Sequence, residues 1–269
     1  MSIQYGAIVP VPHLSLVKGR KFHLILAHMV QQNDRYRDFY KQEARDGATI
    51  ILDNSSYELG DAWATPEDLV RIYESLESKN VYLMCPEVAF KGEETEIAVK
   101  DFTSHLKEGI LTFGTIHGTS YDEICQCYYK VSNLVDYVGF SYRIWCEDLA
   151  VPYPNKTVGR ALMRISLLKR LFENNLILEK KPHHLLGLSE PQELVVQSKY
   201  SWIKSCDSST AFIHGKNKVI FRERGLEGTE RLEERLNFDE TVENPNLVEI
   251  IKHNIRRVDL YGTGKVTDV

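Results

Sequence analysis

Three carboxylates stand where short apolar segments of the chain end. Asp53 closes the run 49–52, Glu87 follows the run 81–84, and Asp207 closes a third run. A carboxylate at the end of a strand can act as a nucleophile, as an acid or base, or as a metal ligand. Each also has a plainer interpretation, since Asp often caps a turn and a Glu after proline can be a solvated loop residue. Their roles depend on whether the fold brings them together.

A metal site is the competing use of such carboxylates. No His-x-His pair or cysteine cluster accompanies them, and the spacing of the five cysteines is irregular. His183 and His184 are adjacent, so on a strand they face opposite sides. We therefore expect no metal.

Strand-like and helix-like segments alternate along most of the chain. Short apolar or β-branched runs predict strands at 23–27, 49–52, 81–84, 110–116, 137–140, 184–186 and 201–203. Helices are predicted at 34–45, from Thr65 and Pro66 through Leu76, at 93–106, from Ser120, at 160–174, between 189 and 201, at 227–240 and at 247–258. In the helix at 160–174 the expected apolar stripe is Leu162, Ile165, Leu168 and Phe172.

Seven strands, most of them followed by a helix, predict an α/β fold: a (β/α)8 TIM-like barrel in one domain, residues 1–269. The eighth strand is not evident, and residues 212–221 could supply it or form a hairpin. In a parallel barrel the carboxyl ends of all strands open on one face, so Asp53, Glu87 and Asp207 would converge there. Carboxylates held together shift each other's pKa and can divide the roles of nucleophile and acid or base.

The bulk composition is that of an ordinary globular protein. The chain has 269 residues, 43% of them hydrophobic, and a net charge of −5. It has no long apolar stretch and no signal peptide at its start, and its cysteines show no disulfide pattern, so we expect a cytoplasmic protein without membrane partners. Residues 156–224 hold 13 Lys or Arg against 6 Asp or Glu, which could mark a surface for a polyanion or only solvated helix faces.

Six segments in order resemble the tRNA-guanine transglycosylase superfamily, and most closely the compact phage DNA-guanine transglycosylases of the DpdA type. The resemblance runs from about residue 23 to 212, and its segments are Ile51 to Glu58, Cys85 to Val88, Gly114 to Gly118, Val138 to Phe140, His184 to Leu188 with Pro191, Glu193 and Leu194, and Ser205 to Ser209. Any one segment is weak, but six in order are fairly specific.

The resemblance implies that guanine in DNA is exchanged for a 7-deazaguanine base without a cofactor. Asp207 would attack the anomeric carbon and form a covalent glycosyl intermediate, and Asp53 would manage protons on the two bases. Glu87 would read the Watson–Crick edge of the base. The residues expected to line the base pocket are His117, Gly118, Gly139 and Gly187.

The basic segment would then hold phosphates of a flipped or single-stranded substrate. The residues expected to do so are Arg160, Arg164, Lys216, Lys218 and Arg222. If the chain is phage-encoded, the compartment is the host cytoplasm.

Two features depart from the family pattern. The tRNA enzymes carry a carboxyl-terminal zinc site built on a cysteine cluster, and no cysteine follows Cys206 here. His117 stands where the family has Gln, which leaves the base preference open. Two alternatives therefore remain: a transglycosylase acting on tRNA, and a non-catalytic nucleic-acid-binding subunit that retains the base pocket.

Overall fold

Eight parallel strands form one sheet that curls into a barrel. The structure is a computed structural model and describes residues 2–60, 63–150, 152–222, 232 and 234–267. The strands are β1 (Gln4–Ala7), β2 (Phe22–Leu26), β3 (Thr49–Asp53), β4 (Val81–Met84), β5 (Leu111–Ile116), β6 (Tyr137–Ser141), β7 (His183–Leu186) and β8 (Ile203–Ser208). Their order in the sheet is β1-β8-β7-β6-β5-β4-β3-β2. The predicted (β/α)8 barrel is confirmed.

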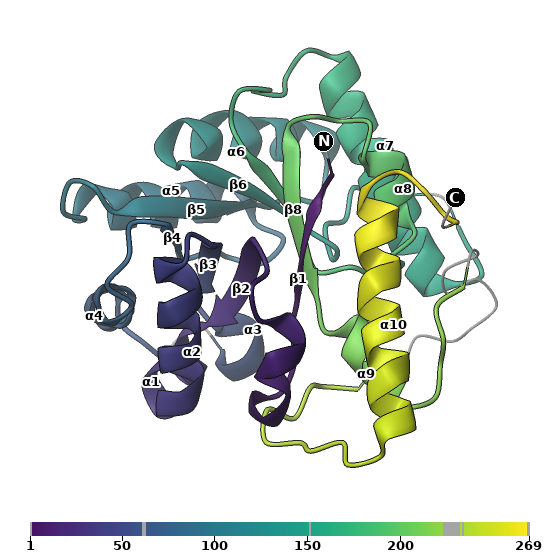
Figure 1. The fold of residues 1–269 in the computed structure, drawn as a ribbon. Coiled ribbons are helices and arrows are strands. Elements are labelled where there is room, and N and C mark those ends of the chain that lie inside the picture. Colours follow the sequence, from purple (N-terminus) through teal and green to yellow (C-terminus); the bar gives the residue numbers. More distant parts are fainter. Residues whose placement is uncertain (1, 61–62, 151, 223–231, 233, 268–269) are drawn as a thin grey trace.

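Helices cover the outside of the strands (Figure 1). They are the 3-10 helices η1 (Val11–Val17) and η2 (Glu147–Leu149), and the α-helices α1 (Ala27–Gln32), α2 (Asp34–Arg45), α3 (Ser56–Leu59), α4 (Pro66–Ser75), α5 (Gly92–Ser104), α6 (Tyr121–Leu134), α7 (Lys156–Glu173), α8 (Glu193–Gln197), α9 (Thr210–Lys216) and α10 (Pro245–Gly262). The predicted caps of α4 and α6 are present, because the side chains of Thr65 and Ser120 accept hydrogen bonds from the first turns of these helices. The cap predicted from Ser189 and Gln192 is wrong, since no side chain of the described residues caps the start of α8.

The eighth strand lies at the amino terminus, which corrects the expectation for residues 212–221. β1 pairs with β8 so that Gly6 lies opposite Asp207. Half of the alternative segment, residues 212–216, belongs to α9, whose Phe212 and Ile213 are buried. A strand of four residues that includes a glycine is too short to show a clear period.

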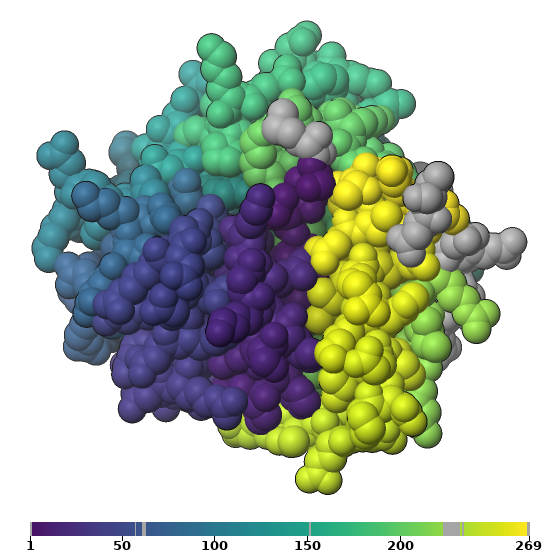
Figure 2. Space-filling model, viewed as in Figure 1, coloured from purple at the N-terminus to yellow at the C-terminus, as the bar shows by residue number. Residues whose placement is uncertain are grey.

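The barrel closes between β1 and β2 through side chains. Within the described part of the chain, no ladder of backbone hydrogen bonds joins these two strands. The Phe22 ring instead packs against Gly6, where an added Cβ would lie 3.0 Å from it, and Arg20 donates to the carbonyl of Tyr5. Outside this seam, the amino-terminal segment and α10 lie side by side (Figure 2), and the Ile3 amide donates to the Gly262 carbonyl over 2.9 Å.

The apolar face of α7 differs from the predicted stripe. Leu162 is 44% exposed, whereas the buried residues are Thr157, Ala161, Met163, Arg164, Leu167, Leu168 and Leu171. The helix is rotated relative to the prediction because Arg164 has a buried partner, Glu193. Of the predicted stripe, Leu168 is buried and Ile165 and Phe172 are half-buried, so only part of the prediction is confirmed. A periodicity rule places an arginine outside and therefore could not include Arg164.

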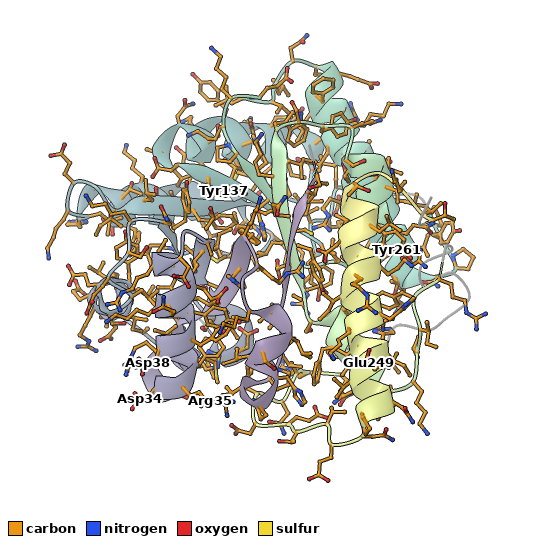
Figure 3. All side chains as sticks on the ribbon, in the orientation of Figure 1. Asp34, Arg35, Asp38, Tyr137, Glu249 and Tyr261 are labelled. Atoms are coloured by element: carbon orange, nitrogen blue, oxygen red, sulfur yellow. The ribbon has the colours of Figure 1, made fainter. Side chains whose placement is uncertain are left out.

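The carboxyl-terminal part also differs in one place. The helix predicted at 247–258 is confirmed within α10, but residues 234–240 are not helical, and residues 227–231 and 233 of that predicted helix lie outside the described residues. Figure 3 shows Tyr137 among the strands, while Asp34, Asp38 and Glu249 lie on outward turns of α2 and α10. Among the described residues, no helix is long and apolar enough to cross a membrane.

Candidate active site

A cavity of about 630 Å³ opens at the carboxyl ends of the strands, which is the usual place for a barrel's active site. Its volume is in the range of small-molecule sites. Six of the seven residues predicted for catalysis and base binding line it: Asp53, Glu87, His117, Gly118, Gly187 and Asp207. The fold therefore brings the three predicted carboxylates to one place.

Asp207 is held through one of its two oxygens. Its Oδ1 accepts a hydrogen bond from the Gly187 amide (2.8 Å) and lies 3.0 Å from His184 Nε2. The other oxygen, Oδ2, accepts no hydrogen bond from any residue that the structure describes. One oxygen thus fixes the carboxylate, and the other is available for attack in the cavity.

A buried hydrogen-bonded chain continues behind Asp207. His184 Nδ1 lies 2.8 Å from Ser205 Oγ, and Ser205 Oγ lies 2.5 Å from the Tyr137 hydroxyl. Burial lowers the pKa of His184 despite the neighbouring Asp207, so the ring is neutral. Because a carboxylate can only accept, we assign the single ring proton to Nε2, which donates to Asp207. This tautomer orients the carboxylate.

Sequence reasoning considered His184 only as a metal ligand and gave it no role. The sequence did contain a signal for His184: because His183 and His184 are adjacent on a strand, one of the two must point into the barrel. His183 faces outward, where it packs on Tyr128 and Trp202. His184 therefore occupies the barrel interior beneath Asp207.

Asp53 is a carboxyl group whose pKa is raised by its surroundings. Burial raises its pKa well above the usual range, and the nearby Glu58, Glu87 and Asp207 raise it further. The Ser55 amide, which donates to Asp53 Oδ1 over 2.6 Å, opposes the shift only in part. Asp53 is thus the turn former of the plainer interpretation, and it also lines the cavity.

Glu58 is a further acidic residue of the cavity that sequence reasoning did not assign. Burial raises its pKa, and Asp207 raises it further. It stands five residues after Asp53, in the segment Ile51 to Glu58. α3 has only four residues, which are too few for a periodic pattern to predict the direction of the Glu58 side chain.

His117 is hydrogen-bonded to Glu87 at the cavity wall. Its Nε2 lies 2.9 Å from Glu87 Oε2, and its Nδ1 accepts from the Phe90 amide over 3.2 Å. The ring proton is therefore assigned to Nε2, which donates to Glu87. Both ring nitrogens are engaged, so the residue that presents free acceptor capacity to a ligand is Glu87.

Two of the three predicted glycines lie at the cavity, and Gly139 does not. Gly187 has φ +66°, and a Cβ there would lie 2.6 Å from the Tyr142 ring. A Cβ on Gly139 would lie 2.3 Å from Phe113, and Gly139 is not among the residues lining the cavity. Gly139 therefore makes room for an aromatic ring inside the barrel, which corrects its predicted role in base binding.

The predicted phosphate-binding residues do not form one surface. Arg164 is completely buried, and Lys216 is paired with Glu234 and Glu240 at 2.5 and 2.6 Å. These two side chains are engaged within the protein, which argues against a role in holding phosphate.

The remaining three predicted phosphate contacts lie in different places. The Arg222 carbonyl accepts from Tyr261, at the end of α10 that contacts Ile3, so Arg222 lies at the opposite end of the barrel from the cavity. Lys218 is exposed beside the middle of α10, since the carbonyl of the next residue, Val219, accepts from Asn254.

Arg160 lies next to the cavity. Its guanidinium stacks 5.7 Å from the ring of Tyr142, which lines the cavity. Charge counting along the sequence could not separate these cases, because pairing and burial are set by the tertiary fold.

The described residues include no group of three or more His, Cys, Asp or Glu that could hold a metal ion. A scan against models of known protein families gives no match to this chain. A search of curated proteins gives no match either. The functional conclusion therefore depends on the site and on the resemblance of the motifs.

Proposed function

We propose that this protein is a base-exchanging transglycosylase that replaces guanine in DNA with a 7-deazaguanine base through a covalent intermediate on Asp207. The observation that carries the proposal is the environment of Asp207, with one oxygen anchored by Gly187 and His184 and the other available in the cavity. A second carboxyl group, Asp53, faces the same cavity with a raised pKa. Two carboxyl groups in different surroundings can divide nucleophile and acid roles.

In the first step, Asp207 Oδ2 forms a bond to C1′ of the nucleotide while the bond between C1′ and N9 of guanine breaks. The electron pair of the broken bond goes to the base, and Asp53 donates a proton to it. In the second step, the incoming base attacks C1′, the Asp207 ester is released, and the Asp53 carboxylate takes up the proton of the new base. Two displacements at C1′ preserve the sugar configuration.

Glu87 supplies the base contact in this proposal. A guanine edge presents N–H donors at N1 and N2, and a carboxylate can accept both. His117 holds Glu87 Oε2 at 2.9 Å, which fixes the orientation of the carboxylate before a base enters. A 7-deazaguanine has the same donors on that edge, so one pocket can take both bases.

DNA is the proposed polymer because the six ordered segments resemble most closely the DNA-guanine transglycosylases. A cavity lying inside the barrel mouth cannot reach a stacked base, so the nucleotide must be flipped out or single-stranded. Arg160, which stacks on Tyr142 beside the cavity, would meet an adjoining phosphate.

The test is incorporation of labelled guanine, or of a labelled 7-deazaguanine, into DNA and, in parallel, into tRNA. We expect incorporation into DNA by the intact protein and its loss in Asp207→Ala. Asp101→Ala is the matched control, since Asp101 is exposed on α5 and should leave the rate unchanged. Activity that survives Asp207→Ala would overturn the proposed mechanism, and incorporation into tRNA alone would overturn the proposed polymer. Tight binding of DNA without incorporation would favour a non-catalytic subunit.

A further inference from the structure

Arg164 and Glu193 form an ion pair that is sealed inside the protein. Both side chains are 0% exposed. Arg164 Nε donates to Glu193 Oε2 over 3.1 Å, and its Nη2 donates to Glu193 Oε1. Burying two charges carries a large desolvation cost, and apolar residues of similar size are often at least as stabilising. The pair therefore calls for an explanation beyond stability.

The remaining donors of Arg164 reach the strand ends beside the nucleophile. Nη1 donates to the carbonyls of Phe140 (2.9 Å) and Leu186 (3.2 Å), and Nη2 donates to that of Gly187 (2.8 Å). One guanidinium thus joins the end of β6 to the turn that follows β7.

The Leu186 carbonyl and the Gly187 amide are the two ends of a single peptide group. The carbonyl accepts from Arg164 and from the Tyr142 amide (2.8 Å), and the amide donates to Asp207 Oδ1 (2.8 Å). A peptide group is planar, so fixing its oxygen also fixes the direction of its N–H. A positive charge at the oxygen also polarises the group and strengthens the donation at the other end.

We propose that Arg164, held by Glu193, is a positioning residue that aims the Gly187 amide at Asp207 and thereby selects Oδ2 as the attacking oxygen. This inference rests on the proposed function in so far as Asp207 is the nucleophile. A purely structural ion pair would affect folding without changing the hydrogen bond between Gly187 and Asp207 or the reaction of the folded protein.

The variant that separates these roles is Arg164→Met with Glu193→Leu. Removing Arg164 alone leaves a buried Glu193 without its partner and risks unfolding, whereas replacing both charges with apolar side chains keeps the volume filled. The matched control is Lys169→Met with Glu173→Leu, an exposed ion pair on the same helix, at 57% and 60% exposure.

The first measurement is the single-turnover rate of adduct formation on guanine-containing single-stranded DNA, together with the Kd for that DNA. We expect the Arg164/Glu193 double variant to form adduct on the order of 10²-fold more slowly with an unchanged Kd, since small misplacements of a reacting group have effects of this size. The Lys169/Glu173 control should match the parent. A folded Arg164/Glu193 double variant that reacts at the parent rate overturns the proposal.

The second measurement does not require activity. In protein labelled with ¹⁵N-glycine, the Gly187 amide resonance should move in the Arg164/Glu193 double variant in the same direction as in Asp207→Ala. An unchanged Gly187 resonance in the folded double variant overturns the positioning role. If the parent forms no adduct, the proposed function fails, and this resonance still decides whether Arg164 positions the amide.

Discussion

At the scale of single residues, carboxyl groups in one cavity have different environments. Asp207 is anchored by two donors, Glu87 is held by His117, and Asp53 and Glu58 have pKa values raised first by burial and then by their acidic neighbours. Chemically similar side chains thus have different hydrogen-bond partners and surroundings in one cavity. Placing several acidic groups in one buried cavity lowers the stability of the folded protein, and natural sites often keep this loss where function requires it.

The raised pKa of Asp53 predicts that Asp53→Asn stabilises the protein at neutral pH. From the unfolded-state pKa of about 3.9 up to the raised folded-state pKa, the folded chain keeps a proton that the unfolded chain has lost. The free energy of unfolding therefore falls as the pH rises through this window and stays lower above it. Asn does not ionise, so the free energy of unfolding of Asp53→Asn does not fall in this way. The Asn side chain can still accept a hydrogen bond from the Ser55 amide.

Urea unfolding of the parent and Asp53→Asn at pH values from about 4 to 8 tests this sign. We expect the two proteins to be similar at the acid end, with the advantage of Asn growing as the pH rises. An Asn variant that is less stable than the parent at pH 8 contradicts the assignment.

The sequence predicted the strand-end residues but not their supports. Asp53, Glu87 and Asp207 could be found because a barrel collects strand ends on one face. His184 and Ser205 support Asp207 from within β7 and β8, where a polar residue on the inner face looks like an exception to the apolar pattern. Their role is visible only once the two strands are paired in register.

At the scale of elements, side chains just after β6 and at the start of α7 lie at the cavity. Tyr142 follows β6, lines the cavity and packs where a Gly187 side chain would lie, and Arg160 from the first turns of α7 stacks on its ring. Arg164, one turn further along α7, reaches the same strand ends from inside. One helix therefore carries both an outer cation and an inner cation toward the site.

Arg160→Ala should weaken DNA binding and reduce the dependence of log K on log salt by about 1, as expected for the loss of one phosphate contact. Lys216→Ala is the matched control, because Lys216 is already paired with Glu234 and Glu240. Binding measured by fluorescence anisotropy between low and moderate salt checks both. Equal slopes for Arg160→Ala and the parent would show that Arg160 does not contact phosphate.

The ends of helices could be predicted from the sequence where capping residues or a proline mark them. Capping side chains and a first-turn proline begin α4, and the predicted α2 agrees with the observed Asp34–Arg45. β1 and the buried face of α7 could not be read in this way. The first pairs with a strand about 200 residues later in the chain, and the second depends on Glu193, which lies in another helix.

At the scale of the whole molecule, the barrel interior is filled by rings below the cavity. Phe113 lies 5.9 Å from Tyr137 and 5.7 Å from His184, measured between ring centroids, and Phe22 lies 5.3 Å from His184. These side chains fill the barrel below the cavity and bury the hydrogen-bonded series that leads from Tyr137 to Asp207. Gly139 supplies the space for the Phe113 ring.

Gly139→Ala should therefore destabilise the barrel by about 1–3 kcal/mol, the usual effect of overpacking a filled core. Combining it with Phe113→Leu should recover part of the loss, because the smaller side chain vacates the space that the new methyl group needs. Thermal and urea unfolding of the single and double variants measure both effects. A Gly139→Ala protein as stable as the parent would show that this contact is easily relaxed.

The most direct test of the central claim is to trap the covalent intermediate on Asp207. The protein is incubated with guanine-containing single-stranded DNA without an incoming base, and in parallel with tRNA, and is then denatured and resolved by gel electrophoresis. We predict a protein–DNA adduct whose mass spectrum places the sugar on Asp207, and a fall in adduct formation of at least about 10⁴-fold in Asp207→Asn. An undiminished adduct in Asp207→Asn, or guanine exchange without any adduct on Asp207, would contradict the account.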